Sequence, residues 1–143
     1  MPYEYLEEVA TADIAFRAWD PDLDGVFIAA ADATMNVMVE DLASIRPVIK
    51  RDLKIENASL ELLLFDLLQE LIYYKDAEAL FLRVTEIRIG QKSHSYLLLA
   101  RCSGEKLDPE RHHTRVDVKA VTMHRFSLQR IGDIWEAFIV LDV

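Results

Sequence analysis

The sequence lacks a second cysteine, a long apolar run and an excess of positive charge, and each absence excludes a class of protein. Cys102 is the only cysteine, so an internal disulfide is excluded, and its apolar neighbours indicate a small core residue rather than a nucleophile. No apolar stretch approaches the roughly twenty residues of a membrane span, and the N-terminus has neither a basic region nor a long apolar run. We therefore expect a cytoplasmic protein that does not enter a membrane.

Positive charge is scarce as well. Sixteen Lys and Arg stand against twenty-five Asp and Glu, which gives a formal net charge of -9. A chain of this charge is repelled by phosphate backbones at neutral pH. We expect no tight binding of nucleic acid by the protein alone.

The length and apolar content predict one globular domain over residues 1–143. The 143 residues are 52% apolar, which is enough to bury a core without metal or disulfide cross-links. Two stretches follow the 3.6-residue period of a helix. One begins after the turn at Asp20–Gly25, where Asp22 or Asp24 can cap it. The other begins at Ser59 and carries an apolar stripe, Leu60, Leu63, Leu64, Leu67, Leu68, Leu71 and Ile72.

The remaining segments alternate in polarity as strands do. The predicted strands are Tyr3–Glu7, Thr11–Trp19, Arg46–Glu56, Leu80–Ile89, Ser95–Cys102, Arg115–Met123, Arg125–Gln129 and Ile134–Asp142, with a hairpin turn at Arg130–Asp133. Helices come early and most strands come late, which is typical of the α+β class. The predicted architecture is a mixed, largely antiparallel sheet with two main helices packed on it, in a single two-layer domain.

The segment from Arg111 to His124 is the first candidate site. Strand alternation would place Val116 and Val118 on a core face and Asp117 and Lys119 together on a charged face. Two residues along a strand span roughly 7 Å, so the lysine could share a pocket with the carboxylate. A same-face Asp and Lys is also an ordinary surface charge pattern, so the residues alone leave both interpretations open.

Asp13, Asp142 and the carboxylate of Val143 form the second candidate site. Asp142 and the terminal carboxylate put up to four oxygens within one residue of each other. If Asp13 lies beside the end of the last strand, the three groups would suit Mg²⁺, Ca²⁺ or Mn²⁺ rather than zinc. Terminal carboxylates are commonly just solvated, so this site too stays open at this point.

Several short motifs follow one another in a specific order and spacing. They are Tyr3–Glu7 with Thr11–Phe16, Leu63–Tyr73 with Asp76–Phe81, Gly104–His112, Val118–His124 and Val140–Val143. Together they resemble the archease family from end to end. One departure is Ala10, which stands where the family commonly has a histidine before Thr-Ala-Asp.

The resemblance implies a function. Archeases are small acidic proteins that assist RtcB-type RNA ligases, which join tRNA halves using GTP and a divalent metal. The resemblance implies that this chain activates such a ligase in tRNA splicing and supports its guanylylation and turnover. It places the family's divalent-metal site, for Ca²⁺, Mg²⁺ or Mn²⁺, on Asp13, Asp142 and Val143. It places the functional lysine on Lys119, with Asp117 and His124 in the same motif.

Two other classes of function remain open. A metal-dependent hydrolase would need a base or nucleophile among His112, His113, His124 and Asp117, and no spacing orders these residues, so we do not expect an enzyme. A chaperone-like or general interaction module without metal chemistry is the stronger alternative. Such a module has no need for Asp13 and Asp142 to meet, so their convergence separates it from a metal-binding activator.

Overall fold

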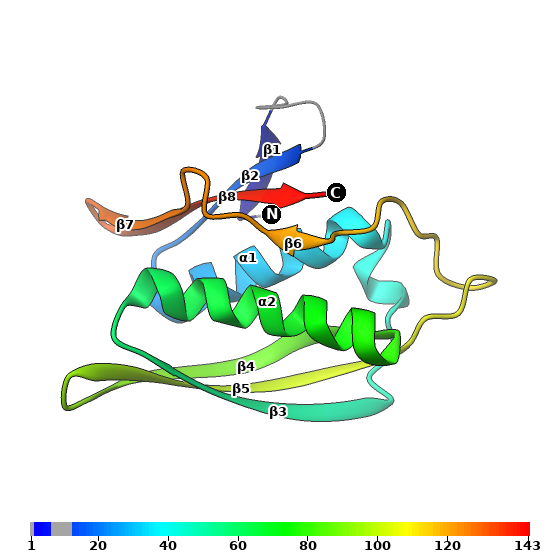
Figure 1. Ribbon diagram of the computed structural model, residues 1–143, viewed down its shortest axis with the longest axis horizontal. Coiled ribbons are helices and arrows are strands. Elements are labelled where there is room, and N and C mark those ends of the chain that lie inside the picture. Colours follow the sequence, from blue (N-terminus) through cyan, green and yellow to red (C-terminus); the bar gives the residue numbers. More distant parts are fainter. Residues whose placement is uncertain (1, 7–12) are drawn as a thin grey trace.

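The computed structural model describes residues 2–6 and 13–143, and in it two helices lie between two antiparallel sheets (Figure 1). Ala10 lies outside the described residues. The elements are β1 (Tyr3–Leu6), β2 (Asp13–Asp20), α1 (Leu23–Met38), a 3₁₀ turn at Leu42–Ser44, β3 (Ile49–Asn57), α2 (Leu60–Glu78), β4 (Leu80–Lys92), β5 (Ser95–Lys106), β6 (Ala120–Val121), β7 (Ser127–Ile131) and β8 (Ile134–Asp142). Neither helix in the described ranges is long and apolar enough to cross a membrane.

The described strands form one sheet in the order β1-β2-β8-β6, with β7 also paired to β8, and a second in the order β3-β5-β4. Every strand pair described is antiparallel. The β7–β8 hairpin turns at Gly132, whose φ of 60° belongs to the left-handed region that glycine tolerates. The predicted α+β class with two main helices is confirmed. The single sheet in a two-layer arrangement is not observed, because the described strands divide into two sheets and the helices fill a middle layer.

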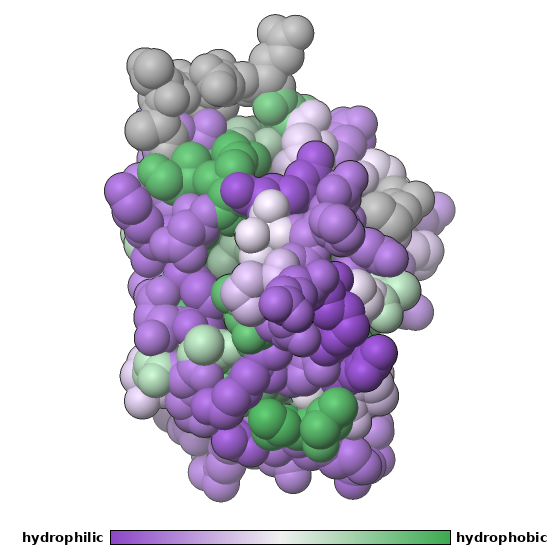
Figure 2. All heavy atoms as spheres, turned by 90° about the vertical axis from the view of Figure 1, so that its right-hand side faces the viewer, coloured by the Kyte–Doolittle hydropathy of each residue, from purple (hydrophilic) through white to green (hydrophobic). Residues whose placement is uncertain are grey.

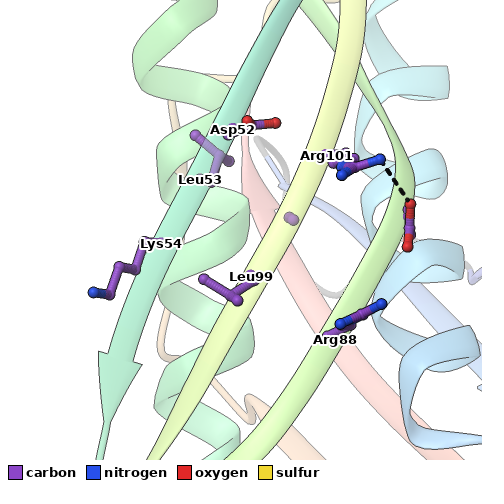
Figure 3. A pocket seen from close by; sticks show the side chains of 8 residues that line it. Asp52, Leu53, Lys54, Arg88, Leu99 and Arg101 are labelled. Atoms are coloured by element: carbon purple, nitrogen blue, oxygen red, sulfur yellow. Dashed lines mark ion pairs between the residues drawn. The ribbon is translucent and has the colours of Figure 1, made fainter.

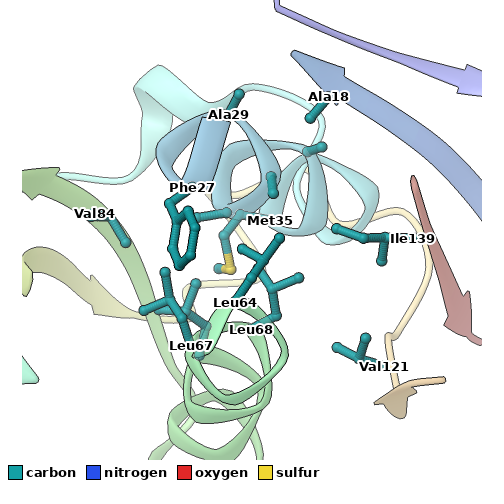
Figure 4. Close-up of a cluster of buried hydrophobic side chains, with 14 of the residues drawn as sticks. Ala18, Phe27, Ala29, Met35, Leu64, Leu67, Leu68, Val84, Val121 and Ile139 are labelled. Atoms are coloured by element: carbon teal, nitrogen blue, oxygen red, sulfur yellow. The ribbon is translucent and has the colours of Figure 1, made fainter. Parts of the chain in front are cut away.

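Both helices carry apolar residues on more than one face, which explains why a second sheet covers them. In α1, Ala29, Ala30, Ala31 and Ala33 are buried together with Phe27 and Met35, so more than one face of this helix is covered. Figure 4 shows Phe27 and Met35 facing Leu64 and Leu68 of α2, with Val84 from one sheet and Ile139 from the other nearby. A single sheet covers only one side of a helix, and two sheets bury both.

The helix α2 has the boundaries that its sequence indicates. The Ser59 hydroxyl accepts a hydrogen bond from the Leu62 amide at 3.3 Å, which caps the first turn, and Ala79 ends the helix in a left-handed conformation with φ of 52°. The predicted stripe from Leu63 to Ile72 is buried, and Leu60 packs partly buried against the core. On the far side, Phe65 meets Phe126 edge to face at a centroid distance of 5.6 Å.

Three local predictions are wrong. The β4 strand extends beyond its predicted end at Ile89 to Lys92, and β5 extends beyond its predicted end at Cys102 to Lys106. At Gly104 a Cβ would collide with the Phe81 carbonyl oxygen, so the close packing of β4 on β5 requires glycine at this position. The strand expected over Arg115–Met123 shrinks to β6, because the amides of Arg115 and Val116 donate to the end of α1, at Met38 O and Val37 O.

Candidate functional site

Asp13 and Asp142 are direct partners across β2 and β8. Their neighbours Ile14 and Leu141 also pair, and Leu141 is buried in the core between the sheets. Because side chains alternate along a strand, the two aspartates project from the opposite face of the sheet. Directly opposed residues have Cβ atoms about 4.5–5.5 Å apart, so the two carboxylates can share one ligand. The convergence that the sequence left open is therefore present.

The end of β8 is held from its other side as well. Ala120 of β6 is the partner of Asp142, and the Lys119 amide donates to the Asp142 carbonyl oxygen at 2.8 Å. Val143 follows and packs partly buried against the core. The backbone of Asp142 is thus fixed between β2 and β6, while its side chain remains partly exposed beside Asp13.

The charges at this point are not balanced within the described chain. Among residues 2–6 and 13–143, no Lys, Arg or His side chain forms an ion pair with Asp13 or Asp142, and no group of three His, Cys, Asp or Glu residues is placed to hold a metal. Among the described residues, the side-chain groups paired at this point are the carboxylates of Asp13 and Asp142. This all-oxygen set fits a hard divalent ion, and it is small enough to leave coordination positions open.

Asp117 contacts a lysine that the sequence did not single out. Its Oδ1 is 2.7 Å from Nζ of Lys75, which also donates to the Val118 carbonyl at 2.7 Å and pairs with Asp76. Burial lowers the pKa of Lys75, and the bonds from Asp117 and Asp76 raise it by more, so the net shift is upward. Lys75 stays protonated and holds the segment before β6 against α2.

Lys119 and His124, the other two candidates, lie on the surface. The Lys119 backbone is bonded to Asp142, but its ammonium forms no ion pair in the described part of the chain and is exposed to solvent. His124 lies in the exposed turn before β7, where its amide donates to the Thr122 hydroxyl at 3.3 Å. The alternation expected for this segment holds for Val118, which is buried, and fails for Val116, which is 42% exposed.

A second charged cluster, centred on Glu105, was missed by sequence reasoning. The Oε1 atom of Glu105 accepts from the Arg46 amide at 2.9 Å, from Arg111 at 2.5 Å and from Nε2 of His112 at 2.8 Å. The bond from Arg111 lowers the pKa of Glu105 most, burial opposes it, and the Arg46 amide and His112 lower it further, to about 2.

The histidine of this cluster has a structural role. Nδ1 of His112 accepts from the Asp108 amide at 2.9 Å, which leaves the proton on Nε2 for the bond to Glu105. Both ring nitrogens are thus committed inside a buried cluster, whereas His113 is exposed. With Asp117 paired to Lys75, these contacts count against the hydrolase interpretation.

The outer face of the β3-β5-β4 sheet carries a shallow hollow of about 290 Å³ (Figure 3). Its charged lining alternates in sign: Arg101 is the register partner of both Asp52 and Glu86, and its guanidinium lies 3.5 Å from Glu86. Lys54 and Arg88 flank Leu99 in the next row. This is the cross-strand charge pairing of a solvated sheet, and it lies on the other sheet from Asp13 and Asp142.

The end of the molecule toward which β8 runs faces the viewer in Figure 2. Hydrophilic residues dominate this face, and the apolar areas visible on it are separate from one another. Fold and site together define a small three-layer α+β protein with paired carboxylates at the end of its last strand.

The comparison with known families matches this class. The model of the Archease protein family (MTH1598/TM1083) matches residues 3–143, so the chain belongs to the archease family. It is 37% identical over 134 residues to the protein archease of Pyrococcus furiosus, covering 93% of this chain and 94% of that protein. It is 35% identical over 142 residues to the protein archease of Methanosarcina mazei, covering 99% and 95%. The family predicted from the sequence is confirmed.

Solved structures agree in fold. The solution structure of Methanobacterium thermoautotrophicum protein 1598 has a TM-score of 0.85 at 31% identity and covers 99% of both chains. The crystal structure of a Thermotoga maritima archease, described as a possible chaperone, has a TM-score of 0.60 at 18% identity, over 94% of this chain and 93% of that one, which is a likeness in fold alone. Neither the family description nor the names of these relatives refers to a catalytic activity.

Proposed function

We propose that this chain is a cytoplasmic accessory protein that activates an RtcB-type RNA ligase in tRNA splicing. It binds the ligase and supports GTP- and metal-dependent guanylylation and turnover through a divalent cation site made of Asp13, Asp142 and the carboxylate of Val143. The observation that carries the proposal is the direct pairing of Asp13 with Asp142 across β2 and β8. A module that only binds other proteins has no need for this pair.

Electrostatics support a cation at this position. Two carboxylates held on opposed strand positions repel each other unless a proton or a cation lies between them, and the carboxylate of Val143 would add to the repulsion. Ca²⁺, Mg²⁺ and Mn²⁺ all prefer oxygen ligands, so the donor set does not choose among them. A bound ion would supply positive charge with coordination positions left over for groups of the ligase or its nucleotide.

The chain's own residues would present that ion to a partner. Lys119 follows the buried Val118 directly and has its ammonium in solvent, where it can reach a phosphate or carboxylate of the ligase complex. His124 offers a second exposed contact beyond β6. Asp117 supports this surface indirectly, through its ion pair with Lys75.

Overall charge supports the choice of partner. An RNA ligase needs a basic channel for its substrate, and a protein of net charge -9 is attracted to such a surface. The same charge disfavours direct binding to RNA, so the proposal places RNA on the ligase and the acidic protein beside it.

A multiple-turnover RNA ligation assay with the cognate ligase tests the proposal. Wild-type protein should increase the number of turnovers per ligase, and Asp13→Asn with Asp142→Asn should remove the increase. Asp133→Asn, in the exposed β7–β8 turn, is the matched control, because it changes the charge of an acid away from the site. Activation that survives the double substitution would favour a chaperone-like interaction module without metal chemistry.

A further inference from the structure

Lys75 is a buried charge whose hydrogen bonds lead from α2 toward the backbone of Asp142. Its side chain, in the last turn of α2, is 8% exposed, although lysine is almost never buried without partners. Its ammonium has three N–H donors, and three oxygens surround it: Asp117 Oδ1, Asp76 Oδ1 and the Val118 carbonyl. No donor is left for a ligand, so the ammonium acts on the chain itself.

One peptide group, between Val118 and Lys119, connects Lys75 to the backbone of Asp142 in the candidate site. The Val118 carbonyl accepts from Lys75 at 2.7 Å, and the amide of the same peptide unit, at Lys119, donates to the Asp142 carbonyl at 2.8 Å. A peptide group is planar, and its C=O and N–H point in opposite directions. The ammonium of Lys75 and the backbone of Asp142 are therefore bridged by a single rigid unit.

This bridge holds the short edge strand β6 in place beside β8. β6 has only two residues, Ala120 and Val121, so few ladder bonds hold it to β8. Gln69 of α2 adds one more anchor, because its Oε1 accepts from the Val121 amide at 3.0 Å. A hydrogen bond from a charged donor also polarises the peptide it contacts, which strengthens the bond that this peptide makes on its other side.

We propose that Lys75 is a positioning residue for the cation site: by holding Asp117 and the Val118–Lys119 peptide, it fixes Asp142 opposite Asp13. The effect on cation binding rests on the proposed function, whereas the effect on the Asp142 backbone does not. If the ion pair of Lys75 only stabilised the fold, its loss would reduce the protection of amides in all elements equally. If Lys75 is a positioning residue, its loss should reduce the protection of the Lys119 amide most.

The test replaces Lys75 with Met, which keeps the length and apolar stem and removes all donors. Amide hydrogen exchange followed by NMR reports the Lys119 bond, and amides of β5 in the other sheet serve as an internal reference for global stability. Relative to β5, we expect the Lys119 amide to exchange about tenfold faster, as the loss of a charge-assisted bond implies. Affinity for Ca²⁺, measured by calorimetry, should fall by about 10–100-fold, as for other outer partners of metal ligands.

Arg83→Met is the matched control, because Arg83 is also a partly buried cation that joins a helix to a sheet, through Asp32 of α1. This variant should lower global stability without a faster exchange of the Lys119 amide relative to the amides of β5. Asp117→Asn is the second variant and should give a smaller change of the same kind, which keeps the test decisive if Lys75→Met does not fold.

Unchanged Lys119 exchange relative to β5 would overturn the positioning role. Faster exchange with unchanged Ca²⁺ affinity would overturn the link to the site. If the wild type binds neither Ca²⁺ nor Mn²⁺, the cation site of the proposed function fails, and the exchange result alone then decides whether Lys75 positions Asp142.

Discussion

Asp117 Oδ1 lies 2.7 Å from Lys75 Nζ, so the carboxylate expected beside Lys119 pairs with a lysine 42 residues earlier in the chain. The pair is asymmetric, because Asp117 is 67% exposed at its side chain and Lys75 is 8% exposed. Removal of the exposed partner leaves a buried charge with fewer ligands, which is destabilising.

Asp117→Ala should accordingly lower the free energy of unfolding by about 1–3 kcal/mol, within the range for a hydrogen bond to a charged group. Asp76 and the Val118 carbonyl still hold Lys75, so complete unfolding is not expected. Urea denaturation measures the change. Glu86→Ala, which breaks an exposed ion pair with Arg101, is the control and should cost much less. Equal losses in the two variants would contradict the role assigned to Asp117.

Leu68→Ala should cost about 2–5 kcal/mol as a large-to-small change in a closed core. Leu68 is fully buried, and Figure 4 shows it between α1 and the residues of both sheets. Leu62→Ala on the same helix, at 38% exposure, should cost well under half as much. Urea midpoints at an unchanged slope give both numbers. A mild effect at Leu68 would mean that the middle layer is loosely packed.

Acid should destabilise the protein through Glu105. The pKa of Glu105 is lowered from 4.5 to about 2 in the folded protein, so the unfolded state binds a proton first as pH falls. This contribution is fully present above about pH 5 and is lost between about pH 5 and pH 2. Glu105→Gln should flatten the dependence of stability on pH in that window, measured by urea denaturation at fixed ionic strength. Glu110→Gln, an exposed acid of the same region, should keep the wild-type slope. Identical slopes in all three proteins would show that other groups govern acid unfolding.

The isolated protein should not bind tRNA appreciably. Its net charge of -9 opposes the counterion release on which phosphate binding depends. Fluorescence anisotropy with labelled tRNA at low and moderate salt measures this directly. Tight binding that weakens as salt rises would contradict the accessory role and place RNA on this chain.

Local periodicity predicted much of the fold. Ile14 and Phe16 alternate with Asp13, and α2 has its apolar stripe and its Ser59 cap, because these patterns depend only on neighbours in sequence. Periodicity does not say which strands pair, so the division into two sheets was not predicted. The breadth of the apolar arcs on both helices was the available signal for a second covering layer.

The candidate site, too, was predicted from the sequence only in part. The sequence predicted the two strands that contain Asp13 and Asp142, and the structure adds the register that pairs these residues. Lys75 and the Glu105–His112 cluster could not be found from the sequence, because their partners come from distant segments or loops. The strand predicted over Arg115–Met123 is mostly absent, because the amides of its first two residues donate hydrogen bonds to carbonyl groups at the end of α1. The polarity pattern of the sequence gives no information about these hydrogen bonds.

We propose that Asp13 and Asp142 together hold one divalent cation through oxygen. Isothermal titration calorimetry with Ca²⁺ and with Mn²⁺ tests it most directly, on the wild type, on Asp13→Ala combined with Asp142→Ala, and on Asp133→Ala as a control for lost negative charge. We expect one cation per wild-type or Asp133→Ala chain and none for the double variant, with the same circular dichroism spectrum in all three. Unchanged cation binding by the folded double variant would contradict it.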